Sequence, residues 1–286
     1  MQKNKLIVVV GPTASGKSEY AIKLAKKIGP PAGGEIISAD SRQVYRGLNI
    51  GAAKLTKKEM RGVPHYCIDV ASPKKAFNVV EYKKCAKEAI EKITKKGKTP
   101  ILAGGTGFYI QAVVDGLILP QVPPNNNLRA LLEKKSAEIL FKMLEKKDPR
   151  RAKTIDRKNK RRLIRALEII EALGKVPQIK QESKYDAKFI GIKRGPEDLK
   201  KRIEKRTRKM LKDGLVRETK KLKNFGLSWK RIYEFGFEYK YPALYLQKKI
   251  SRREMFDAIN YETIDYARRQ MVWFKRDRRI KWTTPR

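Results

Sequence analysis

The sequence has few cysteines and histidines. Its 286 residues include two cysteines, Cys67 and Cys85, and one histidine, His65. The cysteines do not have the spacing of a zinc site, so we expect none. Two cysteines in a chain of this length also argue against a disulfide framework and favour a reducing compartment.

Long apolar runs are also missing. The run at 6–10 is too short for a signal peptide and leads into a glycine-rich turn. No run reaches the roughly eighteen apolar residues of a membrane-spanning helix. We therefore expect a cytoplasmic protein that does not enter a membrane, and we expect a monomer.

Acidic residues are scarce relative to basic ones. The chain has 30 Asp and Glu against 69 Lys and Arg, a formal net charge of +39. This excess predicts attraction to a polyanion, with nucleic acid ahead of a membrane surface, although a lysine-rich solvated surface is the alternative. The densest run has Asp156 as its only acid and suits a phosphodiester backbone. Its basic residues are Arg150, Arg151, Lys153, Arg157, Lys158, Lys160, Arg161, Arg162 and Arg165.

What is present first is an alternation of strands and helices. Apolar runs predict strands, and 3.6-residue periodicity between them predicts helices. This order is typical of a parallel α/β sheet. The predicted strands are 6–10, 35–38, 68–70 and 99–103, and the predicted helices are 19–28 and 79–93.

The composition changes near residue 119, where a Pro- and Asn-rich stretch indicates a turn or linker. Residues 128–173 have helical periodicity, 178–188 look like a loop, and 189–192 predict a strand that returns to the sheet. Helical stretches follow at 196–224, with Pro196 at the helix start, and at 251–274. We therefore predict an α/β core over 1–118, a helical insertion over 119–188 whose basic run suits a nucleic-acid backbone, and core completion with C-terminal helices over 189–286.

The strongest motif follows the first predicted strand and opens a helix. It fits G-x-x-x-x-G-K-[ST], the Walker A loop, whose backbone N–H groups surround phosphate oxygens. Lys17 adds a point charge, and the hydroxyl of Ser18 is suited to hold Mg²⁺. The motif predicts phosphate binding, which is not proof of ATP hydrolysis. The loop comprises Gly11, Pro12, Thr13, Ala14, Ser15, Gly16, Lys17 and Ser18.

Polar residues follow two further strands. Asp40 comes after the second strand, and because ligands bind at the carboxyl edge of open α/β sheets, it should lie beside the P-loop. It could be a Mg²⁺ ligand, a general base or a helix N-cap. Thr106, in the glycine-rich turn at 104–107, offers a hydroxyl donor to developing negative charge.

These residues together resemble the tRNA dimethylallyltransferase family (tRNA isopentenyltransferases). The matching motifs occur in order over nearly the whole chain and are far more specific together than the Walker loop alone. They are GPTASGKS at 11–18, SADSRQVYRGLNIGAAK at 38–54, PHYCID at 64–69, GGTGFY at 104–109, DP at 148–149, RRLIRALEI at 161–169, RIEKRTRKML at 202–211 and YARRQMVWFKRD at 266–277.

The resemblance implies a nucleotide-kinase-like P-loop core with an all-helical insertion that closes over tRNA. It implies that the P-loop holds the diphosphate of dimethylallyl diphosphate instead of ATP, with Mg²⁺. The acceptor is the adenosine at tRNA position 37, next to the anticodon, which is flipped out of its stack at a cost that is least in an unpaired loop.

The resemblance also implies roles for single residues. Asp40 matches the general base, Thr106 the threonine near the reacting amine and the bridging oxygen, and Arg206 the arginine that binds diphosphate. The tRNA contacts that we expect come from Asp40, Ser41, Arg42, Gln43, Thr106, Arg129, Arg161, Arg162 and Arg165.

The chain departs from the family pattern at two positions. Ser18 stands where the family often has threonine, which keeps the hydroxyl. FGFEY at 235–239 is a poor copy of the family's Ile-Gly-Tyr segment, which usually carries a basic residue next, whereas this chain has Glu238. A tRNA contact from this segment therefore has no support. No zinc-finger extension follows the core, as in the shorter bacterial type.

Three other functions fit parts of the sequence. An adenylate isopentenyltransferase would prenylate free nucleotides, but the basic insertion argues against it. A small-molecule kinase would use ATP at the same P-loop, but no clear strand ends in a Walker B acid apart from the turn at Asp40. A non-catalytic RNA-binding protein would not need Asp40 and Thr106 beside a phosphate loop.

Overall fold

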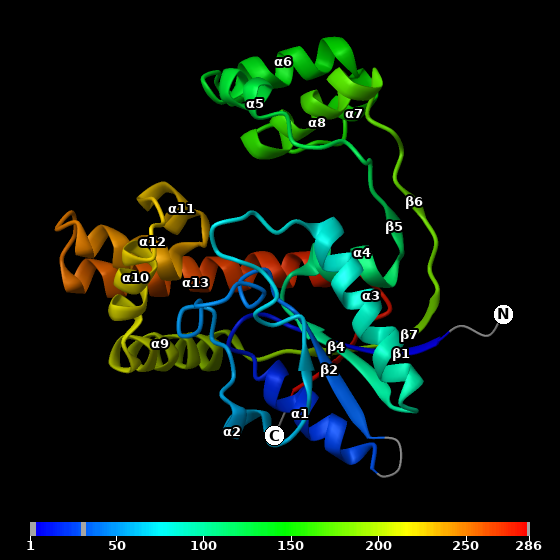
Figure 1. The fold of residues 1–286 in the computed structure, drawn as a ribbon, viewed down its shortest axis with the longest axis vertical. Helices are drawn as coiled ribbons and strands as arrows, with labels where there is room; N and C mark the ends of the chain where they lie inside the picture. The colour runs from blue at the N-terminus through cyan, green and yellow to red at the C-terminus, as the bar shows by residue number, and fades with distance from the viewer. Residues whose placement is uncertain (1–3, 30–32, 285–286) are drawn as a thin grey trace. The chain divides into compact units, whose positions relative to one another are not determined.

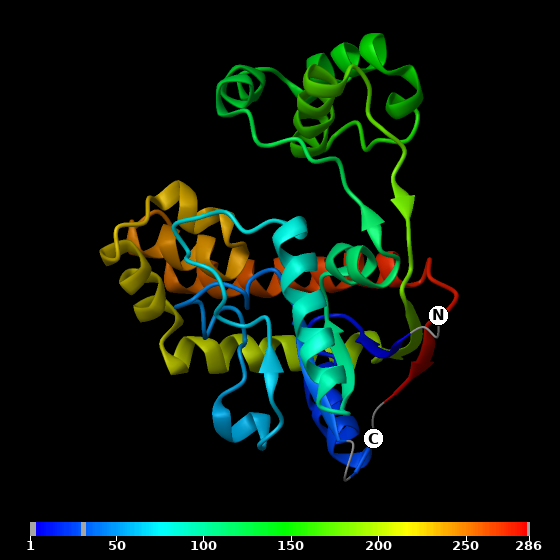
Figure 2. The same cartoon turned by 45° about the vertical axis from the view of Figure 1, so that its right-hand side comes forward.

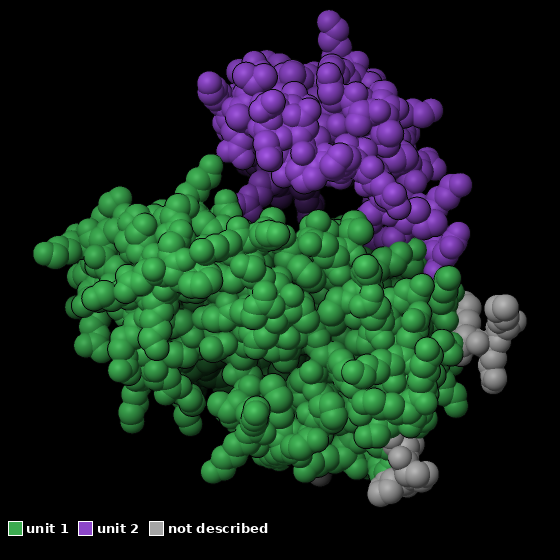
Figure 3. All heavy atoms as spheres, viewed as in Figure 1, with its two compact units in different colours: residues 1–116, 183–286 green, residues 117–182 purple. Residues whose placement is uncertain are grey.

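The structure is a computed structural model that describes residues 4–29 and 33–284, so the outermost residues of the predicted core and C-terminal part lie outside it. The chain divides into two compact units, residues 1–116 with 183–286 and residues 117–182 (Figure 3). The second unit ends before residue 188, the predicted end of the insertion, because strand β7 (Tyr185–Ile192) belongs to the sheet of the first unit.

The first unit is built on a parallel sheet (Figures 1 and 2). Its six strands have the order β3-β2-β4-β1-β7-β8. The strands other than β7 are β1 (Asn4–Val10), β2 (Gly34–Ala39), β3 (His65–Tyr66), β4 (Thr99–Gly104) and β8 (Lys281–Thr283). The predicted parallel α/β class is confirmed.

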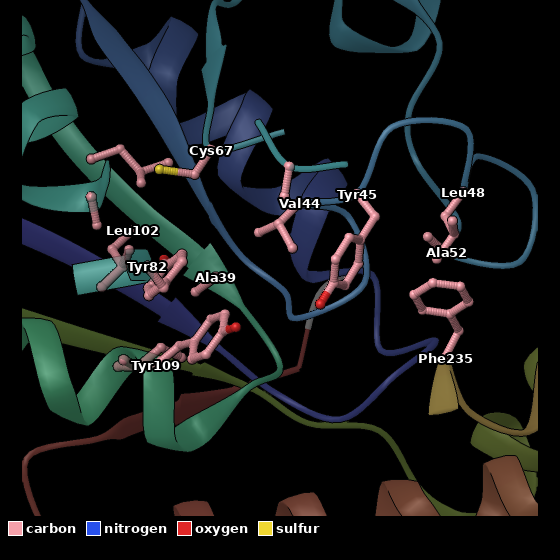
Figure 4. Packing of buried hydrophobic residues seen from close by; sticks show 14 of the residues in the cluster. Ala39, Val44, Tyr45, Leu48, Ala52, Cys67, Tyr82, Leu102, Tyr109 and Phe235 are labelled. Carbon is pink, nitrogen blue, oxygen red and sulfur yellow. The ribbon is translucent and has the colours of Figure 1, made fainter. Parts of the chain in front are cut away.

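Both faces of this sheet are covered, which explains the unbroken apolar runs. Successive side chains of a strand point to opposite faces. Val9 packs in a cluster with Ile22 of helix α1 (Lys17–Lys27), whereas Val8 packs in a cluster with Ile90 of α3 (Val79–Lys95). On the α3 side Tyr82 stacks on Tyr109, with ring centroids 4.0 Å apart (Figure 4).

The strand predicted at 68–70 is wrong. The pairing residues are His65 and Tyr66, and Cys67 and Asp69 then adopt φ values of 59° and 57°. Positive φ is incompatible with an extended strand, so the chain turns there. Strand β8 was not expected, because its three residues contain no apolar run.

The remaining elements of the first unit are helical. The region predicted as one helical stretch over 196–224 is two helices, separated by Gly214, whose φ of 105° ends the first. The helices are α2 (Lys57–Met60), α4 (Gly107–Val114), α9 (Pro196–Asp213), α10 (Leu215–Asn224), α11 (Trp229–Glu234), α12 (Phe237–Leu246) and α13 (Arg252–Phe274).

The second unit has its own core, formed by residues such as Leu140, Leu144 and Leu163. It is helical except for the short antiparallel strands β5 (Leu117–Ile118) and β6 (Lys180–Gln181). Part of the stretch predicted as a loop at 178–188 is therefore strand, in β6 and at the start of β7. The helices are α5 (Asn126–Glu133), α6 (Ala137–Lys147), α7 (Pro149–Ala152) and α8 (Lys160–Leu173).

None of the helices in the described ranges has the length and apolar character needed to cross a membrane.

The backbones of β2 and β4 approach each other closely where these strands end. A Cβ atom on Gly104 would lie 2.2 Å from the carbonyl oxygen of Ala39, whereas one on Gly195 would meet no atom within 4 Å. We expect Gly104→Ala to lower the free energy of unfolding by about 3 kcal/mol, because backbone must move to admit the methyl group. Gly195 has φ of −62°, so Gly195→Ala should change it by less than about 1 kcal/mol. Urea unfolding of both variants checks this, and equal stabilities would contradict it.

Candidate active site

The P-loop forms the turn between β1 and α1. Gly11 must lack a side chain, because a Cβ there would lie 2.4 Å from the carbonyl oxygen of Ile192 in β7. Gly16 has φ of 92° and precedes the first turn of α1, where free N–H groups favour an anion. The side chain of Lys17 folds back, and its Nζ donates to the carbonyl oxygen of Pro12 at 3.2 Å.

Three side chains from the C-terminal half of the chain hold this loop. Arg202 and Arg194 donate to the carbonyl oxygens of Ala14 and Ser15 at 3.0 and 3.3 Å. Gln270, on α13, accepts the N–H of Thr13 and donates to the carbonyl oxygen of Gly105, both at 2.8 Å. Gln270 therefore joins the P-loop to the glycine-rich turn after β4.

Sequence reasoning missed Gln270. It lies within the motif at 266–277, which attracted attention for its arginines and aromatic residues. The available signal was a polar side chain at a position that the helical pattern of α13 predicts to be buried, and the residue is in fact buried. Buried amides almost always have hydrogen-bond partners, so such a position indicates a structural link.

A cavity of about 460 Å³ lies beside the loop. One face of helix α9 lines the cavity, because residues three and four apart lie on the same side of a helix. The lining includes the P-loop, Asp40 and Gly104, which confirms that they share one edge of the sheet. The residues are Thr13, Ala14, Gly16, Lys17, Ser18, Glu19, Ser38, Asp40, Gln43, Ala52, Ala53, Ala103, Gly104, Arg202, Lys205, Arg206 and Lys209.

The cations of this cavity lack sufficient partners. Burial lowers the pKa of Lys17 to about 8, with Asp40 opposing the shift and Arg206 adding to it. Arg206 donates from Nη1 to the hydroxyl of Thr13 at 2.6 Å, but its buried Nε has no hydrogen-bond partner among the described residues. The buried hydroxyl of Ser15 has none either, but Ser15 does not line the cavity. Because unpaired buried polar groups are costly, this arrangement favours a bound anion.

Asp40 is held by the turn that follows it. Its Oδ1 accepts the N–H groups of Arg42 and Gln43 at 2.8 and 3.3 Å, while Oδ2 accepts no hydrogen bond from the residues described. No helix begins at Asp40, so Asp40 is not a helix N-cap. It caps a turn instead. A carboxylate fixed through one oxygen and open at the other is suited to accept a proton.

Thr106 lies next to this turn but not on the cavity wall. Its Oγ1 accepts the N–H of Ser41 at 3.1 Å, and its own N–H donates to the carbonyl oxygen of Ala39. The side chain of Gln43 is occupied as well, since it bonds to Ser38 and to the carbonyl oxygen of Ala52. These contacts order the loop around Asp40.

The second unit places its predicted RNA-binding arginines in two environments. Arg129 and Arg165 both bind the carboxylate of Glu168, which is buried, and so contribute to the core of that unit. Arg161 and Arg162, in the first turn of α8, are exposed. The exposed pair is better suited to bind phosphates, and the tRNA contacts of all four stay predictions.

In the described part of the chain, no group of three or more His, Cys, Asp or Glu side chains could hold a metal ion. A metal in the cavity would therefore need the hydroxyl of Ser18 together with ligand and water oxygens. Mg²⁺ is often bound in this way, through few protein groups and substrate phosphates.

Comparison with known proteins matches this geometry to one family. A family model described as IPP transferase matches residues 43–277. The chain belongs to the IPP transferase family. A tRNA dimethylallyltransferase from Syntrophomonas wolfei is 39% identical over 97% of this chain and 91% of its own length. The tRNA dimethylallyltransferase 2 of Treponema denticola is 42% identical, and the match covers 96% of this chain and 92% of that protein.

Solved structures of this family share the fold. The tRNA isopentenylpyrophosphate transferase of Bacillus halodurans has a TM-score of 0.74 and 36% identity, and the match covers 99% of this chain and 90% of that one. A eukaryotic dimethylallyltransferase acting on tRNA has a TM-score of 0.83 and 27% identity over 98% of this chain and 74% of that one. The predicted family and the P-loop-like fold class are thus confirmed.

The link through Gln270 generates a testable prediction. We expect Gln270→Leu to leave the N–H of Thr13 and the carbonyl oxygen of Gly105 unpaired, which costs about 2–3 kcal/mol of stability. Hydrogen exchange of the peptide over 11–18 should become faster in this variant. Gln178 is exposed, so Gln178→Leu serves as the control. Unchanged exchange in Gln270→Leu would contradict a holding role.

Proposed function

We propose that this protein transfers the dimethylallyl group of dimethylallyl diphosphate to the N6 amine of the adenosine at tRNA position 37. The N6–carbon bond forms as the carbon–oxygen bond to diphosphate breaks, and the amine proton moves to Asp40. The observation that carries the proposal is the cavity in which the half-buried cations of Lys17 and Arg206 lie beside an open carboxylate oxygen of Asp40.

The cavity supports the diphosphate half of this reaction. A leaving diphosphate gains negative charge, which buried donors stabilise more strongly than donors in water. The unpaired Nε of Arg206 and the Lys17 ammonium are such donors, and both residues line the cavity. A bound diphosphate would supply the hydrogen bond that this Nε lacks.

Asp40 supports the acceptor half. The exocyclic amine of adenine is a poor nucleophile because its lone pair is delocalised into the ring, so proton removal during attack helps. The two backbone N–H groups on Oδ1 hold the carboxylate still. We assign Thr106 to the same reacting region, since its hydroxyl lies on the turn that holds Asp40.

Mg²⁺ fits the same cavity. Ser18 would hold it together with diphosphate oxygens and water, and the ion would neutralise charge on the leaving group. Lys17 and Arg206 act from the protein side on that same charge. Metal removal should therefore slow the transfer without unfolding the chain.

The deciding experiment is a transfer assay with labelled dimethylallyl diphosphate, Mg²⁺ and unmodified tRNA, with AMP and ATP in parallel. Label in tRNA, at the adenosine beside the anticodon, supports the proposal. Label only in AMP would make the protein a free-nucleotide prenyltransferase. ATP turnover without prenyl transfer would make it a kinase.

Two variants separate the possible roles of Asp40 as a general base and as a turn cap. Asp40→Asn keeps an acceptor for the N–H groups of Arg42 and Gln43 but removes the base, and Asp40→Ala removes both. We expect both to lower kcat by at least ~10²-fold, the usual contribution of a general base, while tRNA binding stays largely intact. A near-normal kcat for Asp40→Asn would reduce Asp40 to a turn cap.

Exposed arginines of α8 are expected to bind tRNA phosphates. For Arg161→Gln/Arg162→Gln the slope of log affinity against log salt should become shallower by about 0.7–0.9 for each phosphate that is no longer bound. The matched control is Lys26→Gln/Lys27→Gln, at the end of α1, which removes the same charge from the first unit, at the other end of α1 from the P-loop. Equal slopes for both double variants would show that Arg161 and Arg162 do not bind tRNA phosphates.

A further inference from the structure

The segment that departs from its family places a carboxylate against Arg206. Oε1 of Glu238, in the first turn of α12, lies 3.7 Å from Nη2 of Arg206, and the two side chains are 16% and 23% exposed. Gly236, with φ of 106°, precedes this turn, and a Cβ on it would lie 3.6 Å from Oε2 of Glu238. The backbone therefore brings this carboxylate close to the cation assigned to diphosphate.

Charged and titratable groups surround Glu238 on every element packed against it. Arg206 of α9 and Arg42 favour the ionised carboxylate, whereas Asp40 disfavours it. Glu238 also interacts electrostatically with the phenols of Tyr266 of α13 and Tyr239 of α12, although the Tyr239 hydroxyl donates to Glu218, and burial raises the pKa of both phenols. Burial is the largest influence on Glu238 itself and raises its pKa to about 7, against the opposing effect of Arg206.

The three nitrogens of the Arg206 guanidinium thus have three different environments. Nη1 binds Thr13 of the P-loop, Nη2 faces Glu238, and the buried Nε has no partner among the described residues. A diphosphate bound through this guanidinium would bring several negative charges close to the Glu238 carboxylate. Like charges at such distance in a buried site favour protonation of the carboxylate.

We propose that Glu238 is a positioning residue that neutralises Arg206 in the free protein and takes up one proton from solvent when diphosphate binds. The proposal rests on the proposed function, because the anion at Arg206 is the diphosphate of the prenyl donor. It makes donor binding weaker as the pH rises through neutrality, since an ionised Glu238 then competes with the ligand for Arg206.

The test is isothermal titration of the full chain with dimethylallyl diphosphate and Mg²⁺, between about pH 6 and pH 8, in buffers of different ionisation enthalpy. Wild type is compared with Glu238→Gln, which keeps the size of the side chain but cannot ionise. If binding raises the pKa of Glu238 by a further unit, the Kd of wild type should rise about fivefold more than that of the variant over this range. Ionisation of the ligand is common to both proteins and cancels.

Proton uptake is the second readout, and a structural role alone would not change it. We expect wild type to take up more protons per diphosphate near neutral pH than Glu238→Gln does. The control is Glu91→Gln, near the end of α3 and so at the opposite edge of the sheet, which should behave as wild type. If Glu238→Gln does not fold, proton uptake is measured in wild type and Glu91→Gln alone. The absence of proton uptake in these two proteins would overturn the proposal.

The failures of the two proposals are distinguishable. Equal pH dependence and equal proton uptake in wild type and Glu238→Gln would overturn the role of Glu238 while leaving donor binding intact. If instead wild type does not bind dimethylallyl diphosphate, or Lys17→Ala binds it equally well, then the proposed function itself is wrong.

Discussion

The site depends on two half-buried cations that have too few protein anions to pair with them. Lys17 lies in the P-loop and Arg206 on α9, and both face the cavity at the carboxyl edge of the sheet. Burying such charges is unfavourable unless they are paired, so the protein's own groups alone leave the arrangement costly in free energy. In the proposed function, a bound diphosphate supplies the negative charge that the cations lack. Asp40 and Glu238 supply part of that charge in the free protein.

The backbone holds these groups together through a few close contacts. Parallel strands end at the same edge, so β1, β2 and β4 deliver the P-loop, Asp40 and the turn before Thr106 to one place. Gln270 then joins two of these turns through its amide. The same rigidity makes the site sensitive to small changes, because a single methyl group at the end of β4 would meet backbone rather than a mobile side chain.

Much of this was predictable from the sequence, and the successes share a physical basis. Buried parallel strands have apolar β-branched runs, and the P-loop has a glycine pattern that few other structures need. The wrong or missing predictions also share a physical basis. The predicted strand at 68–70 has the right residue types, but positive φ at Cys67 and Asp69, which composition does not reveal, turns the chain. The position of Gln270 and the contact of Glu238 with Arg206 depend on packing between segments distant in sequence.

The segment at 235–239 shows how a poor motif match gains meaning from structure. By sequence, Glu238 was a missing basic residue, and no role followed from it. The fold places it beside the arginine that the family resemblance assigns to diphosphate, so the departure changes the charge of the site itself. A tRNA contact from this segment stays without support, whereas a link to donor binding has a geometric basis.

The most direct test of this account is a crystal structure of the chain with Mg²⁺ and an unreactive dimethylallyl diphosphate analogue whose bridging oxygen is replaced by sulfur. The account predicts diphosphate oxygens within hydrogen-bonding distance of the P-loop N–H groups, Lys17 and Nε of Arg206, with the prenyl carbon facing Asp40. A diphosphate bound elsewhere, or bound at the P-loop with no contact to Arg206, would contradict it.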